Sequence, residues 1–534
     1  MAPATRHRTS LAATVVVILA AGPLWAAAGT ARGHGTPQSA AWTRAAFGDV
    51  PFDSWAWRAI ESLNTAGLTA GCVTTPFPRY CPESEVNRSE MAVFLLGGIH
   101  GSSYTPPPAT GAVFGDVGVG HWAAPWIEEL FAEGLTAGCD AAPLLFCPDA
   151  SVTRAEMAVF LLTAIHGVAY TPPPASGAVF ADVDADHWAA PWIEELFTEG
   201  LTAGCDTAPL RFCPSAPVTR AEASVFLVSG FQVPLVDPPT TPTLGPCLVL
   251  PETSIWNARV DTLPVDAHSS AYIATISAET GFHADFGSGT WEGGPIGIPF
   301  VMVPGTQAPV DITFDYADES DPGPYPIPDN PPIEGGPDST GDRHVLVLDF
   351  DRCLLYETWN SWPQPDGSWH AGSGAVFDLT SNSLRPAGWT SADAAGLPIL
   401  PGLVRYEEVA SGTIRHAIRF TAALTRRAYV WPARHFASSS DDPARPPMGQ
   451  RFRLKAGFDI SPFPAHVQAI LQAMKEYGII LADNGSNWFI SGVPDARWDN
   501  SELQSLSGVH GSDFEAVDAS GLMLDPDSGE AGSP

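Results

Sequence analysis

The feature that most constrains the fold is a unit that occurs three times in the first half of this 534-residue chain. The copies begin FGDVPFDSWAWRAIESLNTAGLTAGC, FGDVGVGHWAAPWIEELFAEGLTAGC and FADVDADHWAAPWIEELFTEGLTAGC. The arginines that mark the copies, Arg88, Arg154 and Arg220, recur at intervals of 66 residues. A fixed period of this length predicts stacked or pseudo-symmetric units that share one core.

Each copy predicts two helices joined by a loop. In the second copy, apolar residues recur at helical spacing from Trp122 onward. A second helix is predicted from Thr153 to Gly167, with Thr153 as its N-cap and Glu156 three residues on, in the capping-box position. Helix capping alone therefore explains the Thr and Glu of the Thr-Arg-Ala-Glu box, which leaves Arg154 as the residue available to a ligand.

The first 28 residues are typical of a secretory signal. Arg6 and Arg8 form a basic segment, LAATVVVILAAG an apolar core, and the alanines at 26–28 a cleavage site. A transmembrane anchor is the alternative, but the run is short for a span, and no later segment is long and apolar enough. The net charge of −33 disfavours nucleic acid, because phosphate binding needs clustered Lys and Arg. We therefore expect a secreted protein of the cell surface or envelope without a transmembrane span after cleavage.

The eight cysteines predict disulfides. An even number in an exported chain favours bridges, whereas zinc is disfavoured because no CxxC pair or neighbouring His completes a ligand set. One short loop is closed in each repeat, and a fourth bridge ties the start of the second half to a central strand. The predicted pairs are Cys72 with Cys81, Cys139 with Cys147, Cys205 with Cys213, and Cys247 with Cys353.

The motifs F-x-D-V, W-A, W-I-x-x-L, G-L-T-A-G, F-C-P and V-T-R-A-E-M-A-V-F-L recur over residues 43 to about 233, and this pattern resembles an S-layer homology (SLH) triplet. The resemblance implies an all-α pseudo-trimer that attaches non-covalently to cell-wall polysaccharide. It also implies that the arginine of the box and the early tryptophan line the ligand groove. Wall-polymer binding then falls on Arg154, Arg220, Arg88, Trp122 and Trp188.

Two features depart from a simple wall-binding pattern. The first copy reads VNRSEMAVFL, so that Asn87 and Ser89 replace the Thr and Ala of the box. Residues 42–234 also hold 21 Asp and Glu against 7 Arg. An anionic polymer is therefore repelled except where a groove focuses positive charge.

Proline-rich segments divide the chain. YTPPPATGAVF and YTPPPASGAVF separate the repeats, and VPLVDPPTTPTLGPC follows the third. The predicted organisation is a signal peptide (1–28), three repeats (43–106, 110–173 and 176–234), a Pro/Thr linker (235–245), a β-rich domain (246–516) and a flexible acidic tail (517–534).

The second half predicts a β-rich, sandwich or jelly-roll-like domain with a few helices. RHVLVLDF, CLLYETW and TIRHAIRFTA alternate between apolar and polar residues, and Gly, Pro and Asp turns separate such runs. One clear helix is predicted in PAHVQAILQAMKEYG, which ends at Gly478.

Residues 315–344 form the densest polar stretch of this half. Paired carboxylates suit glycoside cleavage, carboxylates with backbone carbonyls suit Ca²⁺, and a solvated acidic loop is the plain alternative. Histidines in apolar strands are more often core residues than functional ones. The candidate catalytic residues of a polysaccharide hydrolase or lyase are Glu334, Asp342, His344, His416 and His435.

The rival hypothesis is a binding or structural module without catalysis, in which exposed tryptophans stack on sugar rings. WNSWPQPDGSWH is its first candidate surface because the segment is rich in turns. The two hypotheses differ in whether the carboxylates and histidines converge. No cofactor is predicted beyond the candidate Ca²⁺, and the expected partners are cell-wall polysaccharide and an extracellular glycan.

Overall fold

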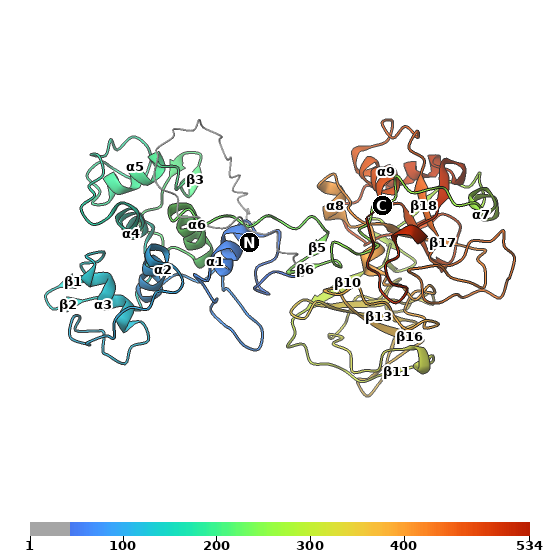
Figure 1. Ribbon diagram of the computed structural model, residues 1–534, viewed down its shortest axis with the longest axis horizontal. Helices are drawn as coiled ribbons and strands as arrows, with labels where there is room; N and C mark the ends of the chain where they lie inside the picture. Colours follow the sequence, from blue (N-terminus) through green and yellow to red (C-terminus); the bar gives the residue numbers. More distant parts are fainter. Residues whose placement is uncertain (1–42, 534) are drawn as a thin grey trace, which may run out of the picture. The chain divides into compact units, whose positions relative to one another are not determined.

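The structure is a computed structural model that describes residues 43–533, so the predicted signal peptide lies outside the described residues. The chain forms two compact units (Figure 1). The repeat unit comprises Thr65–Thr69 and Glu83–Val236, and the C-terminal unit comprises 43–64, Ala70–Pro82 and 237–533. The beginning of the first repeat and its disulfide loop therefore pack with the second half of the chain. Among the described helices, none has the length and apolar character needed to cross a membrane.

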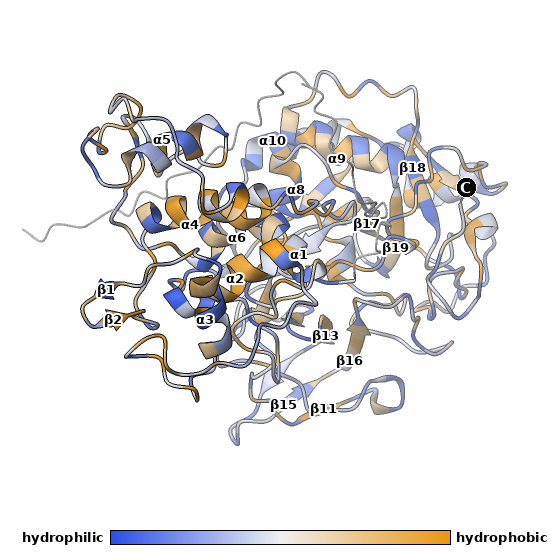
Figure 2. Cartoon of the chain, turned by 60° about the vertical axis from the view of Figure 1, so that its left-hand side comes forward, coloured by the Kyte–Doolittle hydropathy of each residue, from blue (hydrophilic) through white to orange (hydrophobic). Residues whose placement is uncertain are grey.

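Helices and short hairpins alternate in the repeat unit. The three helices that follow the capping boxes are largely apolar, as the orange colour of α2, α4 and α6 shows in Figure 2. The elements are α2 (Arg88–His100), α3 (Ala124–Ala132), β1 (Asp140–Ala141), β2 (Leu144–Leu145), α4 (Arg154–His166), α5 (Ala190–Thr198), β3 (Asp206–Thr207), β4 (Leu210–Arg211) and α6 (Arg220–Gly230).

The predicted capping boxes are confirmed. At the start of α4, the Thr153 hydroxyl accepts the backbone N–H of Glu156, and the Glu156 carboxylate accepts the backbone N–H of Thr153. Asn87 and Thr219 form the same reciprocal pair of bonds before α2 and α6. Each box satisfies N–H groups that the first helical turn leaves without partners.

A closed ring of backbone hydrogen bonds joins the segments that precede α2, α4 and α6. The N–H of Val86 donates to the carbonyl of Val218, that of Val152 to Val86, and that of Val218 to Val152, each at 2.9 Å. Each repeat therefore supplies one donor and one acceptor to the other two. Removal of any one copy would leave backbone groups unpaired in both of the others.

The C-terminal unit is built around a six-stranded mixed sheet in the order β21–β18–β19–β17–β20–β7. β17 runs parallel to β19, and β7 runs parallel to β20, whereas the other neighbours are antiparallel. The strands are β7 (His283–Asp285), β17 (Ile418–Ala422), β18 (Arg451–Leu454), β19 (Ile479–Asn484), β20 (Phe489–Ser491) and β21 (Phe514–Val517). Stacked Phe420 and Trp488, with ring centroids 5.5 Å apart, lie in its core.

A second, four-stranded sheet has the order β10–β12–β13–β16, and a three-stranded sheet the order β11–β15–β14. Their strands are β10 (Phe300–Val303), β11 (Ile312–Phe314), β12 (Val345–Asp349), β13 (Leu354–Trp359), β14 (Trp362–Pro363), β15 (Trp369–Ala371) and β16 (Ser373–Asp378). Two hairpins are formed by β5 (Thr243–Leu244) with β6 (Cys247–Leu248), and by β8 (Thr290–Trp291) with β9 (Gly294–Pro295).

Short helices complete the C-terminal unit. The α-helices are α1 (Trp57–Thr65, in this unit up to Asn64), α7 (Ser269–Ile276), α8 (Tyr406–Ala410), α9 (Ala465–Glu476) and α10 (Asn500–Gln504). The 3₁₀ helices are η1 (Ala317–Glu319), η2 (Leu400–Gly402), η3 (Ser505–Gly508), η4 (Gly511–Asp513) and η5 (Ser520–Leu522). The predicted helix PAHVQAILQAMKEYG is confirmed as α9, which buries Val467, Ile470, Leu471 and Met474.

The predicted fold class is wrong. The N-terminal region is not an all-α pseudo-trimer, because the hairpins β1–β2 and β3–β4 lie in its loops and the first repeat is divided between the two units. The second half is not a sandwich or jelly roll, because parallel pairing enters both of its larger sheets. Strands of two residues are too short to produce an alternating pattern, and parallel pairs depend on segments that are distant in sequence.

All four predicted disulfides are confirmed: Cys72–Cys81, Cys139–Cys147, Cys205–Cys213 and Cys247–Cys353. The segment for which the sequence predicts a flexible tail lies against the C-terminal unit as far as residue 533. Trp431 Nε1 donates to the Ser528 carbonyl at 2.7 Å, and the Ile255 N–H donates to the Gly529 carbonyl at 2.9 Å.

One buried carboxylate holds the disulfide loop of the first repeat in the C-terminal unit. Asp351 accepts Nη1 and Nη2 of Arg79, both at 2.6 Å, and the N–H of Gly305 at 2.8 Å. The side chain of Asp351 is only 1% exposed, so the ion pair is largely desolvated. The loop position of Arg79 is occupied by Leu145 in the second copy, which cannot form this pair.

Candidate functional site

A groove of about 350 Å³ lies beside the start of α4 in the repeat unit. The second repeat supplies one wall and the third repeat the other, and the lining residues are Thr153, Ala155, Glu156, His187, Trp188, Pro214 and Ser215. Trp188 is 63% exposed, which is unusual for a tryptophan. The groove therefore combines an open aromatic face with hydroxyl and carboxylate groups.

The exposed tryptophan recurs one repeat earlier. Trp122 is 62% exposed, and its ring centroid lies 6.0 Å from that of His121. The ring centroid of Trp188 likewise lies 5.9 Å from that of His187. In both copies, Nδ1 of the histidine accepts the N–H of the alanine two residues later, at 3.2 Å. The backbone of the repeat thus fixes the direction of this aromatic pair.

The arginines of the boxes are buried rather than presented to solvent. Arg154 is 4% exposed, and its Nε donates to the Phe212 carbonyl at 2.8 Å. Its Nη1 donates to the Glu222 carboxylate at 2.7 Å, and the guanidinium lies 5.0 and 5.5 Å from the ring centroids of Phe212 and Phe226. Burial lowers the pKa of Arg154, and the charge of Glu222 opposes that shift.

The arginines and capping glutamates link the repeats in a circle. Each guanidinium donates to the capping glutamate of another copy, in the pairs Arg88–Glu156 (2.8 Å), Arg154–Glu222 (2.7 Å) and Arg220–Glu90 (2.6 Å). One glutamate therefore caps a helix and also receives a buried arginine. Ligand binding by Arg88, Arg154 and Arg220 stays a prediction.

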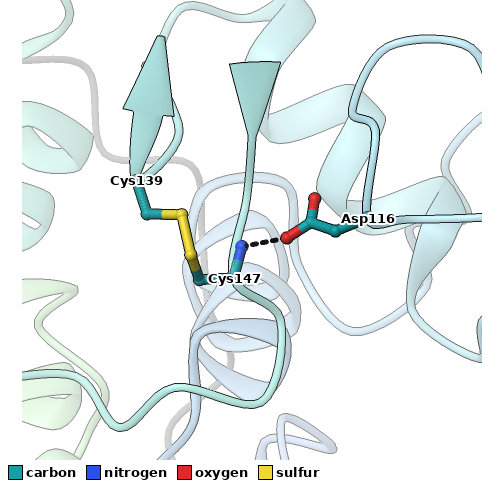
Figure 3. Close-up of side chains that lie close together, drawn as sticks. All are labelled: Asp116, Cys139 and Cys147. Atoms are coloured by element: carbon teal, nitrogen blue, oxygen red, sulfur yellow. Dashed lines mark hydrogen bonds between the residues drawn. A yellow bond between two sulfur atoms is a disulfide. The ribbon is translucent and has the colours of Figure 1, made fainter. Parts of the chain in front are cut away.

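Asp116 lies beside the Cys139–Cys147 disulfide (Figure 3). Potential ligand atoms of these residues lie within 4.8 Å of one another, as do those of Asp182, Cys205 and Cys213. The sulfurs are oxidised, however, whereas metals bind thiolates. Asp116 accepts the backbone N–H groups of Phe146 and Cys147 at 2.8 and 2.7 Å. The cluster holds a loop in place and gives no support for Ca²⁺.

Three of the five predicted catalytic residues converge in the C-terminal unit. His344 lies 2.5 Å from Glu334 through Nδ1 and Oε2, and 3.1 Å from the Ala392 carbonyl through Nε2. The charge of His344 lowers the pKa of Glu334, and an ionised Glu334, like the Ala392 carbonyl, only accepts; both ring nitrogens of His344 therefore donate, which makes it an imidazolium. Asp342 accepts a hydrogen bond from Trp359 Nε1 at 3.1 Å and interacts electrostatically with His344.

The charges of this pair stabilise each other. Burial alone lowers the pKa of His344, but Glu334 outweighs it, with the hydrogen bond and Asp342 adding to the effect, and the pKa rises to about 9. Burial alone raises the pKa of Glu334, but His344 reverses the shift and lowers it overall. At neutral pH the pair is therefore carboxylate and imidazolium.

His416 and His435 have separate partners. His416 lies 2.8 Å from the Ala417 carbonyl through Nδ1 and 3.2 Å from Glu408 through Nε2. His435 lies 2.9 Å from the Ala394 carbonyl through Nδ1. Neither forms a hydrogen bond with Glu334, Asp342 or His344 within residues 43–533.

The six-stranded sheet brings further polar groups to the Glu334–His344 pair, and of these sequence reasoning missed Asp285 and Ser491. Arg419 on β17 donates to Asp393 through Nε at 3.0 Å and Nη2 at 2.8 Å, and through Nη1 to Ser491. Asp285 on β7 stands opposite Ser491 in the register of β7 with β20. Their strands are paired across long stretches of sequence, so no local pattern marks Asp285.

The chain therefore combines repeats that carry a groove with a C-terminal unit of mixed sheets and helices, and four disulfides cross-link it. Models of known protein families give no match to the sequence. A similar curated protein is the cellulosome-anchoring protein of Acetivibrio thermocellus, which is 28% identical over 148 residues. The match covers 28% of this chain and 32% of that protein, so the chain spans about a third of the relative's length.

Proposed function

We propose that the protein is anchored at the cell surface by its repeat unit, which binds a cell-wall polysaccharide and thereby displays the C-terminal unit. The observation that carries this proposal is the 350 Å³ groove with Trp188 exposed on its wall. The resemblance of the repeats to SLH triplets and the similarity to a cellulosome-anchoring protein support an anchoring role. The four disulfides agree with an oxidising, extracellular setting.

The groove favours a sugar without negative charge. A pyranose ring stacks on the open face of Trp188, while Thr153 and Ser215 offer hydroxyl groups to sugar hydroxyls. Glu156 adds a negative charge to the lining, and the positive charge of Arg154 is buried against Glu222. An anionic polymer would therefore meet repulsion that a neutral sugar does not.

In this proposal, the arginines of the boxes are positioning residues. Arg88 donates to Glu156, whose carboxylate lines the groove and caps α4. The guanidinium thereby fixes the direction of a groove carboxylate without touching the sugar. The predicted binding tryptophans, Trp122 and Trp188, provide the contact surface.

A wall pull-down with the secreted protein tests the proposal. We expect Trp188→Ala to weaken binding to purified cell walls by about 30-fold, the effect of losing about 2 kcal/mol at a central aromatic contact. Adding Trp122→Ala should weaken it further. Val119→Ala is the matched control, because Val119 is 67% exposed in the same unit and lies outside the groove lining. Unchanged wall binding by the folded double tryptophan variant would refute the groove.

A further inference from the structure

Asp285 and Glu334 are brought to the same region by a hairpin. The chain leaves Asp285 at the end of β7 and enters β8–β9, whose base is closed by the Gly287 N–H donating to the Ile296 carbonyl at 3.1 Å. At Gly294 there is no room for a side chain, because a Cβ would lie 1.9 Å from the carbonyl carbon of Gly335. The hairpin that starts beside Asp285 therefore packs against the residue that follows Glu334.

The surroundings of Asp285 and Glu334 shift the pKa values of the two carboxyl groups in opposite directions. Desolvation raises the pKa of Asp285, although the residue remains exposed, and the charge of Glu334 raises it further. Glu334 is held ionised by His344, which occupies its Oε2. No hydrogen bond to Oε1 of Glu334 occurs within residues 43–533. Two carboxyl groups whose pKa values are pushed apart form the pattern of a general acid beside a general base.

Three aromatic side chains lie on segments that packing, a hydrogen bond or charge connects to this carboxyl pair. Tyr316 is 51% exposed, and its ring centroid lies 6.5 Å from that of Trp359. Trp359 donates to Asp342, whose charge acts on both Asp285 and His344. Trp291, in the hairpin that packs beside Glu334, is 71% exposed. Rings of this kind stack on the faces of sugars, so they point to a glycan as the ligand.

We propose that the C-terminal unit hydrolyses a neutral polysaccharide, with Asp285 as general acid, Glu334 as general base, and Tyr316, Trp359 and Trp291 as sugar-stacking surfaces. Asp285 gives its proton to the glycosidic oxygen as the bond to the anomeric carbon breaks. Oε1 of Glu334 takes a proton from the water whose oxygen bonds to that carbon. One water is consumed and two hydroxyl ends form, after which solvent returns the proton from Glu334 to Asp285.

His344 is a positioning residue in this reaction, because both of its ring nitrogens are already engaged. It orients Glu334 and keeps its carboxylate ionised. A neutral substrate is favoured because the carboxylates of Glu334 and Asp342 would repel uronic acids, as would the net charge of −33. This site lies in the C-terminal unit, so the proposal does not depend on wall binding by the repeats.

The test measures the reducing ends that the secreted full-length protein releases from polysaccharides. The neutral polymers are xylan, mixed-linkage β-glucan and glucomannan, and polygalacturonate is the anionic probe. We expect cleavage of at least one neutral polymer and none of polygalacturonate. Asp285→Asn and Glu334→Gln should each lower kcat by at least about 1000-fold with little change in KM. Asp318→Asn and Glu279→Gln are controls, because both residues are exposed acids of the same unit.

Two further variants distinguish a residue that contacts the sugar from a residue that only positions Glu334. Tyr316→Ala should raise KM more than it lowers kcat, because stacking binds substrate and transition state alike. His344→Gln should move the acidic limb of the kcat/KM profile to higher pH, because Glu334 loses its cationic partner. A purely structural role would leave that limb unmoved.

Several results would overturn the proposal. The wild-type protein would release no reducing ends from any of the three neutral polymers, or a folded Asp285→Asn or Glu334→Gln variant would keep full activity. Unsaturated products would also overturn it, because they indicate elimination rather than hydrolysis. Trp122 and Trp188 variants should keep hydrolytic activity on soluble polymers, so failure of wall anchoring is distinguishable from failure of this site.

Discussion

Replacing Arg154 with alanine distinguishes an arginine that ties repeats together from one that contacts the wall polymer. The substitution removes the hydrogen bonds from Nε to Phe212 and from Nη1 to Glu222. It also removes the guanidinium that lies over the rings of Phe212 and Phe226. Because Arg154 is only 4% exposed, water does not readily take over these contacts.

The expected cost is about 3 kcal/mol of unfolding free energy. Breaking a buried ion pair costs about 3–5 kcal/mol when the remaining charge stays buried. The Glu222 side chain is 30% exposed and still accepts the Thr219 N–H, so it is partly rehydrated and the lower end applies. For a domain of this size, about 3 kcal/mol corresponds to a Tm lower by roughly 6–12 °C.

Calorimetry of the purified protein measures this shift, and Arg211→Ala is the control because Arg211 is an exposed arginine of the third repeat. A double-mutant cycle with Glu222→Gln should give a coupling energy of about 1 kcal/mol or more. Below the transition, Arg154→Ala should bind cell walls nearly as the wild type does. An unchanged Tm together with lost wall binding would refute the structural role and make Arg154 a polymer ligand.

Three further outcomes are expected. The C-terminal unit should lose up to about 3 kcal/mol of stability between pH 6.5 and 9, because folded His344 has a pKa of about 9 and the unfolded chain binds that proton less tightly. Urea midpoints measured against pH should show this fall in the wild type and not in His344→Gln. Arg79→Ala should cost about 3 kcal/mol by leaving Asp351 buried without its cation, and adding Asp351→Asn should recover part of the Tm; an equal or larger loss in the double variant contradicts this. The double variant Cys139→Ser with Cys147→Ser should lose about 2–3 kcal/mol of unfolding free energy in calorimetry, because the disulfide joins residues that are eight apart in the sequence. An unchanged stability would mean that the hydrogen bonds to Asp116 alone hold the loop.

Features of this protein that depend on residues close together in the chain could be predicted from its sequence. A capping box is complete within four residues, so Thr153 and Glu156 already defined the start of α4. The repeat cysteines lie eight or nine residues apart, and short separations leave few alternative partners. The acidic stretch before His344 likewise contained Glu334, the residue that the structure pairs with it.

Only the tertiary structure decided the partners of the buried charges. Arg154 reaches Glu222 across 68 residues, and Arg79 reaches Asp351 across 272. Any of the 59 acidic residues could neutralise an arginine, and nothing in the sequence ranks them. Periodicity shows which face of a segment is buried but not what covers it. For that reason the division of the first repeat, the parallel strands and the place of Asp285 followed from long-range packing alone.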